Sequence, residues 1–233
     1  MIKIENTDVY GFEAAIRGMR NPMNSWNKSD TRWTDDFDAI GNKAWIDYES
    51  ESGLCKVIGE NDLKLMQNLS KAGNDHGKFL RMINVTCDIT APLYWWKEFD
   101  TYKVGTVANS CSTMHKIHAK EFTLDDFSHE HLSEPAISIL KNTIEALNQA
   151  RDLYLGYDGF KHRWGDWEKK HYWWQMIQLL PSSYNQKRTV QLNYQVLKTM
   201  YFARRNHKLD EWHTLCEWME SLPYFKEVCI DVG

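Results

Sequence analysis

One segment of this chain places side chains with metal-ligand chemistry at helical spacing. His115, His118 and Glu121 would share one face of a helix, because residues three or four apart are neighbours on a helix surface. Zinc sites use His and carboxylate ligands of this kind. The HExxH pattern is absent, however, and the chain has no third His or Cys at a suitable spacing. We therefore expect no metal site, and interpret residues 129–131 (His-Glu-His) as a helix cap or surface segment.

The same segment carries candidate nucleophiles. Ser110 or Ser112 could be combined with His115 and an Asp into a catalytic triad, but no GxSxG motif supports that arrangement. GxGxxG and GxxxxGK[ST] are also absent, so Rossmann dinucleotide binding and P-loop phosphoryl transfer lack sequence support. The five cysteines are odd in number and show no CxxC spacing, which argues against a disulfide framework or a zinc–cysteine site.

Cationic residues gather near the C-terminal end of the chain, and two interpretations remain open. We expect a helix over 188–205 that begins at Arg188 and ends near Arg204, Arg205, His207 and Lys208. Cations in a last turn interact favourably with the helix dipole, and this explanation is favoured. The alternative is a clamp for an anionic ligand, for which the guanidinium fork is well suited.

The chain has 11 Trp, several-fold more than is usual. Trp95–Trp96 and Trp173–Trp174 are adjacent pairs, so each pair points in two directions. Packing in a core or interface is the favoured interpretation, and stacking on a nucleobase or an isoalloxazine ring is the alternative. Trp26, Trp33 and Trp45 lie in the polar stretch 20–52, which is typical of an insertion or a functional loop.

Composition excludes several classes of protein. The 233 residues suggest one domain over 1–233, with 42% hydrophobic and 26% charged residues. The net charge of −4 argues against a nucleic-acid polymer as partner, because such binders carry a basic excess. No apolar run approaches the roughly 18 residues of a membrane span, and the N-terminus lacks the apolar core of a signal peptide. We expect a cytoplasmic protein without membrane contact.

The elements that must position these residues are mostly helices. Residues 79–89 alternate in polarity and form the best strand candidate, and 1–9 form a candidate edge strand. Loops are expected over 102–118 and 156–170. Helices are predicted over 10–19, 62–72, 93–101, 135–155, 172–180, 188–205 and 209–222. We predict an α+β fold, in which a small, mainly antiparallel sheet is covered by long helices.

The order of these features resembles the flavin-dependent thymidylate synthase (ThyX) family. The family's Gly-His-x-[ST]-x-Phe-x-His segment corresponds to 73–79, and its x-Pro-Ile/Leu turn to Ala91-Pro92-Leu93. Its Ala-x-Arg helix corresponds to AAIRGMRN (14–21), and its Asn-x-Arg-x-Leu helix to 193–197. A Leu-Arg-x-x-x-His-type segment corresponds to 203–207 and the closing helix to 210–212. These matches cover about half the chain, in the family's order.

The motif residues themselves differ from the family pattern. The signature Arg-His-Arg falls on Thr101-Tyr102-Lys103, or one residue later, and the Gln before it on Glu98. The motif Glu falls near Asn109 or Ser110, and the substrate-side Arg on Gln195. The motif Ser falls on Cys111, or on Ser112 with one inserted residue, and the following Arg on Thr113 or Met114. Four or five cationic groups are thus replaced by neutral ones.

The resemblance implies a reductive methylation of a dUMP-like pyrimidine deoxynucleotide. It further implies FAD as cofactor, NADPH and methylenetetrahydrofolate as co-substrates, and a homotetramer with flavin sites at its interfaces. Implied catalytic residues are Ser112 and Lys103; implied cofactor-binding residues are His76, Lys103, Arg204 and His207; implied substrate-binding residues are Glu98, Asn109, Ser112 and Gln195.

The lost cations leave a second interpretation open. Each charge-assisted hydrogen bond contributes about 1.5–3 kcal/mol, so losing several should abolish tight dUMP binding unless other cations compensate. The candidates for compensation are Lys103, Lys116, Arg163, Arg188 and Arg204. The alternative function is therefore a catalytically inactive or repurposed nucleotide-binding or interaction protein of the same fold. Glu98 could accept a hydrogen bond from an exocyclic amine, which makes a cytosine-type base conceivable.

Overall fold

The computed structural model describes residues 2–34, 55–156 and 166–232. The chain divides into two compact units, which are described separately here. The first unit comprises 1–3, 89–101 and 109–188, and the second comprises 4–88, 102–108 and 189–233. No helix in the described ranges is both long enough and apolar enough to cross a membrane.

Two expectations on organisation stay predictions. One is the single domain over 1–233. The other is the polar insertion over 20–52, because residues 35–54 lie outside the described part of the chain. Trp45 and Arg163 likewise lie outside it.

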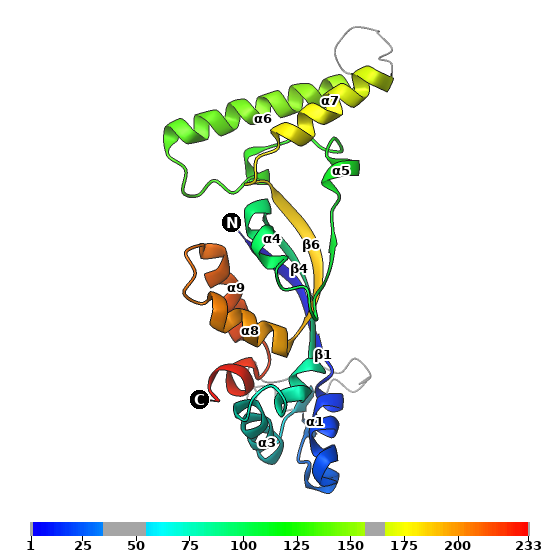
Figure 1. Ribbon diagram of the computed structural model, residues 1–233, viewed down its shortest axis with the longest axis vertical. Helices are drawn as coiled ribbons and strands as arrows, with labels where there is room; N and C mark the ends of the chain where they lie inside the picture. Colours follow the sequence, from blue (N-terminus) through cyan, green and yellow to red (C-terminus); the bar gives the residue numbers. More distant parts are fainter. Residues whose placement is uncertain (1, 35–54, 157–165, 233) are drawn as a thin grey trace. The chain divides into compact units, whose positions relative to one another are not determined.

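The fold is α+β with a small, mainly antiparallel sheet and long helices, as predicted (Figure 1). The larger sheet has the strand order β1-β4-β6-β5, so the N-terminal strand lies at an edge, as expected. Its strands are β1 (Lys3–Tyr10), β4 (Asn84–Pro92), β6 (Asn185–Asn193) and β5 (Val107–Ser110). A second, two-stranded antiparallel sheet pairs β2 (Arg32–Thr34) with β3 (Cys55–Val57).

Strand β4 is shorter at its start than predicted. Val85, Cys87 and Ile89 are buried in alternation with half-buried neighbours, which is the burial pattern of a strand. The residues before Asn84 instead form a 3₁₀ helix, η4 (Gly77–Arg81). Phe79 and Leu80 are adjacent and both buried, which a strand facing one core cannot achieve. The prediction of a strand over 79–83 is therefore wrong.

The predicted helix over 188–205 is wrong in its first third. Arg188 does not begin a helix but lies within strand β6, where Gln186, Val190 and Leu192 are buried. Helix α8 (Tyr194–Arg204) begins only after Asn193, whose side-chain oxygen accepts the Val196 N–H at 3.0 Å. This N-cap bond satisfies one of the free donors of the first helical turn and fixes the boundary.

The predicted loop over 102–118 contains regular structure. Strand β5 occupies Val107–Ser110, and a short helix, α5, occupies Thr113–Lys116. All four side chains of β5 are exposed at the sheet edge. Because no side chain of β5 is buried, its sequence lacks the alternation of apolar and polar residues by which a strand is recognised.

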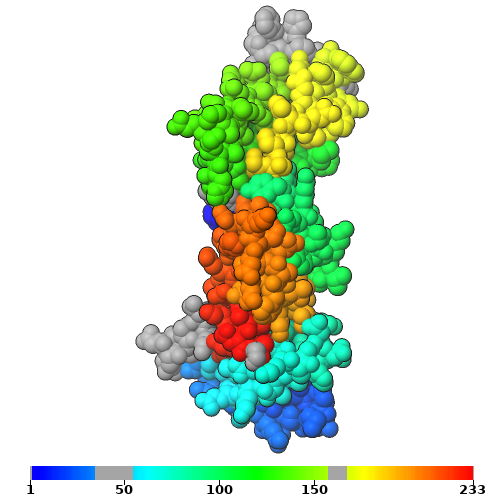
Figure 2. Space-filling view, turned by 60° about the vertical axis from the view of Figure 1, so that its left-hand side comes forward, coloured from blue at the N-terminus to red at the C-terminus, as the bar shows by residue number. Residues whose placement is uncertain are grey.

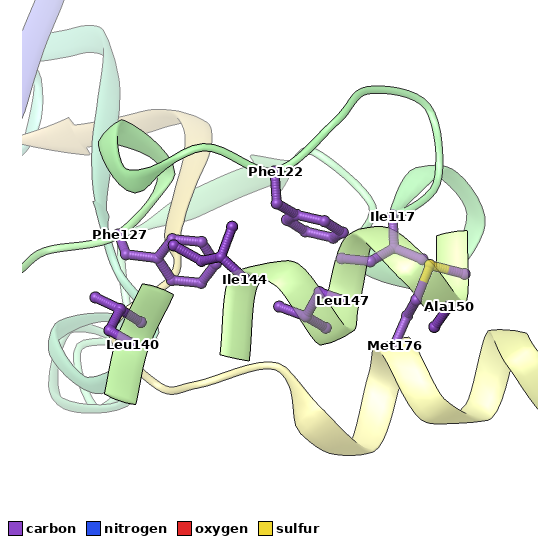
Figure 3. Close-up of a cluster of buried hydrophobic side chains, with 8 residues drawn as sticks. All are labelled: Ile117, Phe122, Phe127, Leu140, Ile144, Leu147, Ala150 and Met176. Atoms are coloured by element: carbon purple, nitrogen blue, oxygen red, sulfur yellow. The ribbon is translucent and has the colours of Figure 1, made fainter. Parts of the chain in front are cut away.

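The first unit has a core built on two long helices. Helix α6 (Glu134–Leu155) packs along α7 (Asp166–Leu179), as Figure 1 shows, and the helices predicted over 135–155 and 172–180 are confirmed. Helix α7 already begins at Asp166, so the prediction of a loop over 156–170 is wrong from that residue on. Leu140, Ile144 and Leu147 recur at helical spacing on α6 and are buried. They meet aromatic residues of the preceding segment, η5 (Leu124–Asp126) and its flanks (Figure 3). The complete cluster is Ile117, Phe122, Phe127, Leu140, Ile144, Leu147, Ala150 and Met176.

The second unit packs short helices around an aromatic core. Phe12, Tyr194, Tyr224 and Phe225 are buried there in edge-to-face contacts. On the face shown in Figure 2, α8 and α9 (orange) lie at the surface. The remaining helical elements of this unit are α1 (Phe12–Arg20), η1 (Asn21–Met23), η2 (Trp26–Lys28), α3 (Glu60–Lys71), α9 (Asp210–Ser221) and η6 (Lys226–Ile230).

Candidate functional site

The tryptophan pair of α4 (Leu93–Phe99) belongs to the core. Trp95 and Trp96 are 0% and 1% exposed, and both pack against Phe99 with ring centroids 5.1 Å apart. The Trp96 indole N–H donates to the Gln186 carbonyl at 2.9 Å. The packing interpretation is confirmed, and neither ring offers a free face to a heterocycle. On α7, Trp173 donates to the Met114 carbonyl at 2.9 Å while Trp174 is exposed, so that pair does point in two directions.

Arg188 is the centre of a polar cluster in the first unit. Its Nη1 donates to Asp100 Oδ1 at 2.7 Å and its Nε donates to Gln186 Oε1 at 3.0 Å. Its guanidinium lies 4.2 Å from the centre of the Trp96 ring. The Asp100 carboxylate neutralises the guanidinium charge. Arg188 is therefore a weak candidate to replace a missing phosphate-binding cation.

Gln186 joins this cluster to the segment that carries the predicted motif serine. Its side-chain amide donates to the Cys111 carbonyl at 2.8 Å, and the Cys111 N–H donates to the Lys187 carbonyl at 2.9 Å. The next residue, Ser112, is the N-cap of α5, because its Oγ accepts the His115 N–H at 3.0 Å. Cys111 and Ser112 are both exposed, so both thiol and hydroxyl lie at the surface.

The other two predicted residues of the first unit lie on separate elements. Asn109 is exposed on strand β5, and Glu98 is half-buried in the last turn of α4. The Glu98 carbonyl accepts a hydrogen bond from the Thr101 hydroxyl at 2.7 Å, which closes the end of that helix. Glu98, Asn109 and Ser112 thus lie on α4, on β5 and at the start of α5, respectively.

Arg204 is the centre of a second cluster, which lies entirely in the second unit. Its Nε donates to the Tyr102 hydroxyl at 2.9 Å. Its guanidinium lies 4.8 Å from the centre of the Trp212 ring and 5.6 Å from that of Tyr102. Because aromatic faces attract cations, these contacts hold the last residue of α8 in one orientation. An arginine held in this way is suited to binding a phosphate or carboxylate.

His207 completes the Arg204 cluster. Its ring stands edge-on to Trp212 at 6.2 Å, and its Nδ1 accepts the Leu209 N–H at 3.2 Å. Because Nδ1 accepts, the ring proton of the neutral form lies on Nε2. The sequence correctly grouped Arg204 with His207 but did not identify Trp212. A buried aromatic residue two positions into a closing amphipathic helix has no sequence feature that distinguishes it from ordinary core packing.

The remaining predicted residues of the second unit surround α8. Lys103 is exposed and directly follows Tyr102, the hydrogen-bond partner of Arg204. His76 is exposed at the start of η4, which packs against α8. Gln195 is half-buried in the first turn of α8. Five of the eight predicted residues thus lie on or beside this helix.

Helical geometry separates two of them. Gln195 and Arg204 are nine residues apart, which is about 13 Å along the axis and half a turn around it. They therefore lie on opposite sides of α8 in one chain and cannot both hold the same small group.

The histidines considered as metal ligands do not form a site. His118 packs against Tyr154 with ring centroids 4.6 Å apart. Burial, followed by the charges of Lys116 and Arg151, lowers the pKa of His118, which favours its neutral form. Among the residues that the structure describes, no three His, Cys, Asp or Glu side chains are grouped to hold a metal ion.

Comparisons with known proteins identify the fold. The chain matches no model of a known protein family and no curated protein sequence. It does match a crystal structure of the flavin-dependent thymidylate synthase ThyX from Helicobacter pylori in complex with FAD and dUMP. The TM-score is 0.60 at 14% identity, over 99% of each chain. A second H. pylori ThyX structure with FAD and dUMP gives a TM-score of 0.61 at 16% identity, over 100% of this chain and 99% of the other. The chain therefore has a ThyX-like fold.

Proposed function

We propose that the protein is a divergent flavin-dependent thymidylate synthase, which reductively methylates a pyrimidine deoxynucleotide such as dUMP. The observation that supports this proposal is the Arg204 cluster, an oriented arginine at the end of α8 in a ThyX-like fold. The H. pylori ThyX structures of this fold hold FAD and dUMP.

The side chains around the Arg204 cluster fit an anionic dinucleotide cofactor. The Arg204 guanidinium would bind a phosphate group of FAD, and Lys103 would add a second positive charge beside it. His207, with its proton on Nε2, would donate a hydrogen bond, and His76 would approach from η4. When bound and reduced, FAD would supply the hydride, with NADPH as reductant and methylenetetrahydrofolate as carbon donor.

The residues proposed to bind the substrate differ in type from the motif residues of the ThyX family. Ser112 and Asn109 would donate hydrogen bonds to the nucleotide, and Lys103 and Ser112 would orient the reacting base. Gln195 stands on the opposite side of α8 from Arg204. The two residues would therefore bind different groups, Arg204 the cofactor and Gln195 the substrate, and the proposed assembly is a homotetramer with flavin sites at its interfaces.

Flavin binding tests this proposal. Purified protein incubated with FAD and then gel-filtered should retain about one flavin per chain, measured by its visible absorbance. Arg204→Gln should reduce the affinity for FAD by at least about tenfold, because one charge-assisted hydrogen bond contributes about 1.5–3 kcal/mol. Arg205→Gln is the matched control, since Arg205 is exposed and contacts Phe202 instead. A colourless protein that cannot be reconstituted with FAD contradicts the proposal.

Calorimetry of dUMP and dCMP binding tests the substrate. If the Glu98 carboxylate accepts a hydrogen bond from an exocyclic amine, dCMP binds more tightly than dUMP, and Glu98→Gln reverses the preference. Equal or absent binding of dCMP excludes the cytosine-type substrate and leaves dUMP.

A further inference from the structure

A pocket of about 360 Å³ lies in the second unit, apart from the Arg204 cluster. This volume falls in the range of small-molecule sites, about 300–1,000 Å³. Helix α1 forms one wall, because residues three and four apart share a helix face. The other lining residues come from η2, β2, β3 and the segment between η2 and β2. The charged and aromatic side chains of the lining include those of Glu13, Arg17, Trp26, Arg32, Trp33 and Lys56.

A buried ion pair holds the pocket in shape. Arg20 is 4% exposed and donates through Nε to Asp62 Oδ1 at 2.7 Å. Its two Nη atoms donate to the carbonyls of Ser25 and Lys28, both at 3.0 Å. The other Asp62 oxygen accepts the side-chain hydroxyls of Ser29 at 2.7 Å and Thr31 at 2.8 Å. The pocket wall over residues 25–31 is therefore fixed by side chains from α1 and α3.

The charges in the pocket are unbalanced. Arg20 is neutralised by Asp62, and Lys56 forms an ion pair with Glu13. Arg17 and Arg32 form no ion pair or side-chain hydrogen bond with any residue in the described ranges. Among the described residues, the lining side chains and their ion-pair partners thus carry a net charge of +2, which complements a phosphate monoester at neutral pH, whose charge is about −1.5 to −2.

The pocket also has aromatic walls. Trp33 is 41% exposed, and the Lys56 ammonium lies 4.3 Å from its ring centre. Trp26 is 51% exposed, and its indole N–H donates to Asn21 Oδ1 at 2.8 Å, which orients the ring. Two partly exposed indoles lie beside the guanidiniums of Arg17 and Arg32, which have no ion-pair partner in the described part of the chain. This combination matches a ligand with a planar ring and an anionic group, because indole faces stack on heterocycles.

We propose that this pocket is a second ligand site, which binds a phosphate monoester carrying a planar aromatic or heterocyclic ring. Arg17 and Arg32 bind the phosphate, and Trp26 and Trp33 contact the ring. The site is independent of the proposed FAD and dUMP functions, since it shares no residue with them.

The test uses GMP as probe on the full-length protein. Calorimetry measures its affinity, and the indole ¹H–¹⁵N signals locate it, with Trp26 and Trp33 assigned from Trp26→Phe and Trp33→Phe. We expect GMP to shift these two signals. Guanosine and inorganic phosphate should each bind at least about tenfold more weakly, because each lacks one half of the ligand. Arg17→Gln and Arg32→Gln should each weaken GMP binding at least about tenfold.

Matched controls separate this site from others. Arg81→Gln removes an exposed arginine of the same unit, and Trp174→Leu removes an indole of similar exposure on α7, so both should leave GMP binding unchanged. Arg204→Gln should also leave it unchanged, which distinguishes this pocket from the proposed cofactor site. The proposal is overturned if GMP does not bind, if it binds Arg17→Gln and Arg32→Gln as tightly as the unchanged protein, or if the shifted indole signals belong to other tryptophans.

Discussion

Two arginines, one in each unit, are each held by a carboxylate, but their surroundings differ. In the second unit, Arg20 and Asp62 are 4% and 0% exposed, and both side chains use their remaining hydrogen-bonding atoms on the segment 25–31. In the first unit, Arg188 and Asp100 are 15% and 51% exposed. The first pair organises a loop that forms a pocket wall. The second connects strand β6 to the end of α4 and is partly screened by solvent.

From this difference we expect that burial and complete hydrogen bonding determine how much each ion pair contributes to stability. A buried pair is costly to break because the remaining partner is left as an uncompensated charge. A pair with an exposed partner loses little, because water replaces the missing group. We therefore expect substitutions in the Arg20–Asp62 network to lower the free energy of unfolding more than substitutions at the Arg188–Asp100 pair.

Asp62→Ala should destabilise the protein by about 3–5 kcal/mol, because it leaves the Arg20 guanidinium buried without its counter-charge. Urea unfolding measures the change, with Asp75→Ala, an exposed aspartate of the same unit, as control. A loss below about 1 kcal/mol would mean that the pair behaves like an exposed one.

Acid should remove the stability that the ionised Asp62 carboxylate contributes to this network. Burial by itself would raise the pKa of Asp62, but hydrogen bonds from Ser29, Thr31 and Arg20, with the Arg20 charge, outweigh burial and lower it. The ionised carboxylate therefore contributes stability above the unfolded pKa of about 3.9, and that contribution is lost as the pH falls through the lower folded value.

Urea midpoints at several pH values check the direction of this effect. The difference between the unchanged protein and Asp62→Asn should be largest at neutral pH and should shrink below about pH 4. A difference that grows in acid contradicts the assignment of the lowered pKa to Asp62.

Gly59→Ala should destabilise by about 1–3 kcal/mol, the usual cost of forcing extra volume into a packed region. A Cβ at Gly59 would lie 2.2 Å from Asp30 Cγ. The Asp30 carboxylate accepts the Asn61 and Asp62 N–H groups at 2.9 and 3.1 Å, and so caps α3 beside the Asp62 network. Urea unfolding measures the loss, and Gly73→Asn, at an open left-handed turn, should cost less.

Asp100→Ala should cost no more than about 1 kcal/mol, because Asp100 is half exposed and Arg188 keeps its contacts with Gln186 and Trp96. Urea unfolding measures this loss beside that of Asp62→Ala. A loss as large as that of Asp62→Ala would remove the distinction between the two regions.

The sequence predicted the fold well where apolar spacing is regular. Helix α6, in which Leu140, Ile144 and Leu147 recur at helical spacing, matches the helix predicted over 135–155. The predictions of the edge strand β1 and of helices α3 and α9 are also confirmed. Strand β6 was missed because the run after Arg188 was assigned to the following helix. Strand β5 was missed because its exposed residues show no alternation. In both cases the limits of the strand depend on its pairing in the sheet and on the cap of the following helix, which the sequence pattern does not show.

The candidate site was predictable only in part. Arg204 and His207 were both predicted to bind the cofactor, and both side chains contact Trp212, but their role stays a prediction. Tyr102 was noted only as an altered motif position, and its contact with Arg204 spans 102 positions in the chain. The tryptophans have different roles at different positions in the chain. Trp95 and Trp96 fill the core, whereas Trp26 and Trp33 line the pocket. The sequence indicated this difference only through context, because Trp95 and Trp96 lie in an apolar helix whereas Trp26 and Trp33 lie in a polar stretch.

Formation of dTMP tests the central claim most directly. Protein reconstituted with FAD is incubated with dUMP, NADPH and methylenetetrahydrofolate, and the nucleotide products are separated and quantified. The account predicts dTMP that forms only with FAD present, at a rate that falls sharply in Arg204→Gln and not in Arg205→Gln. Protein that binds FAD and dUMP but forms no dTMP would contradict the methylation and leave a nucleotide-binding protein of the same fold.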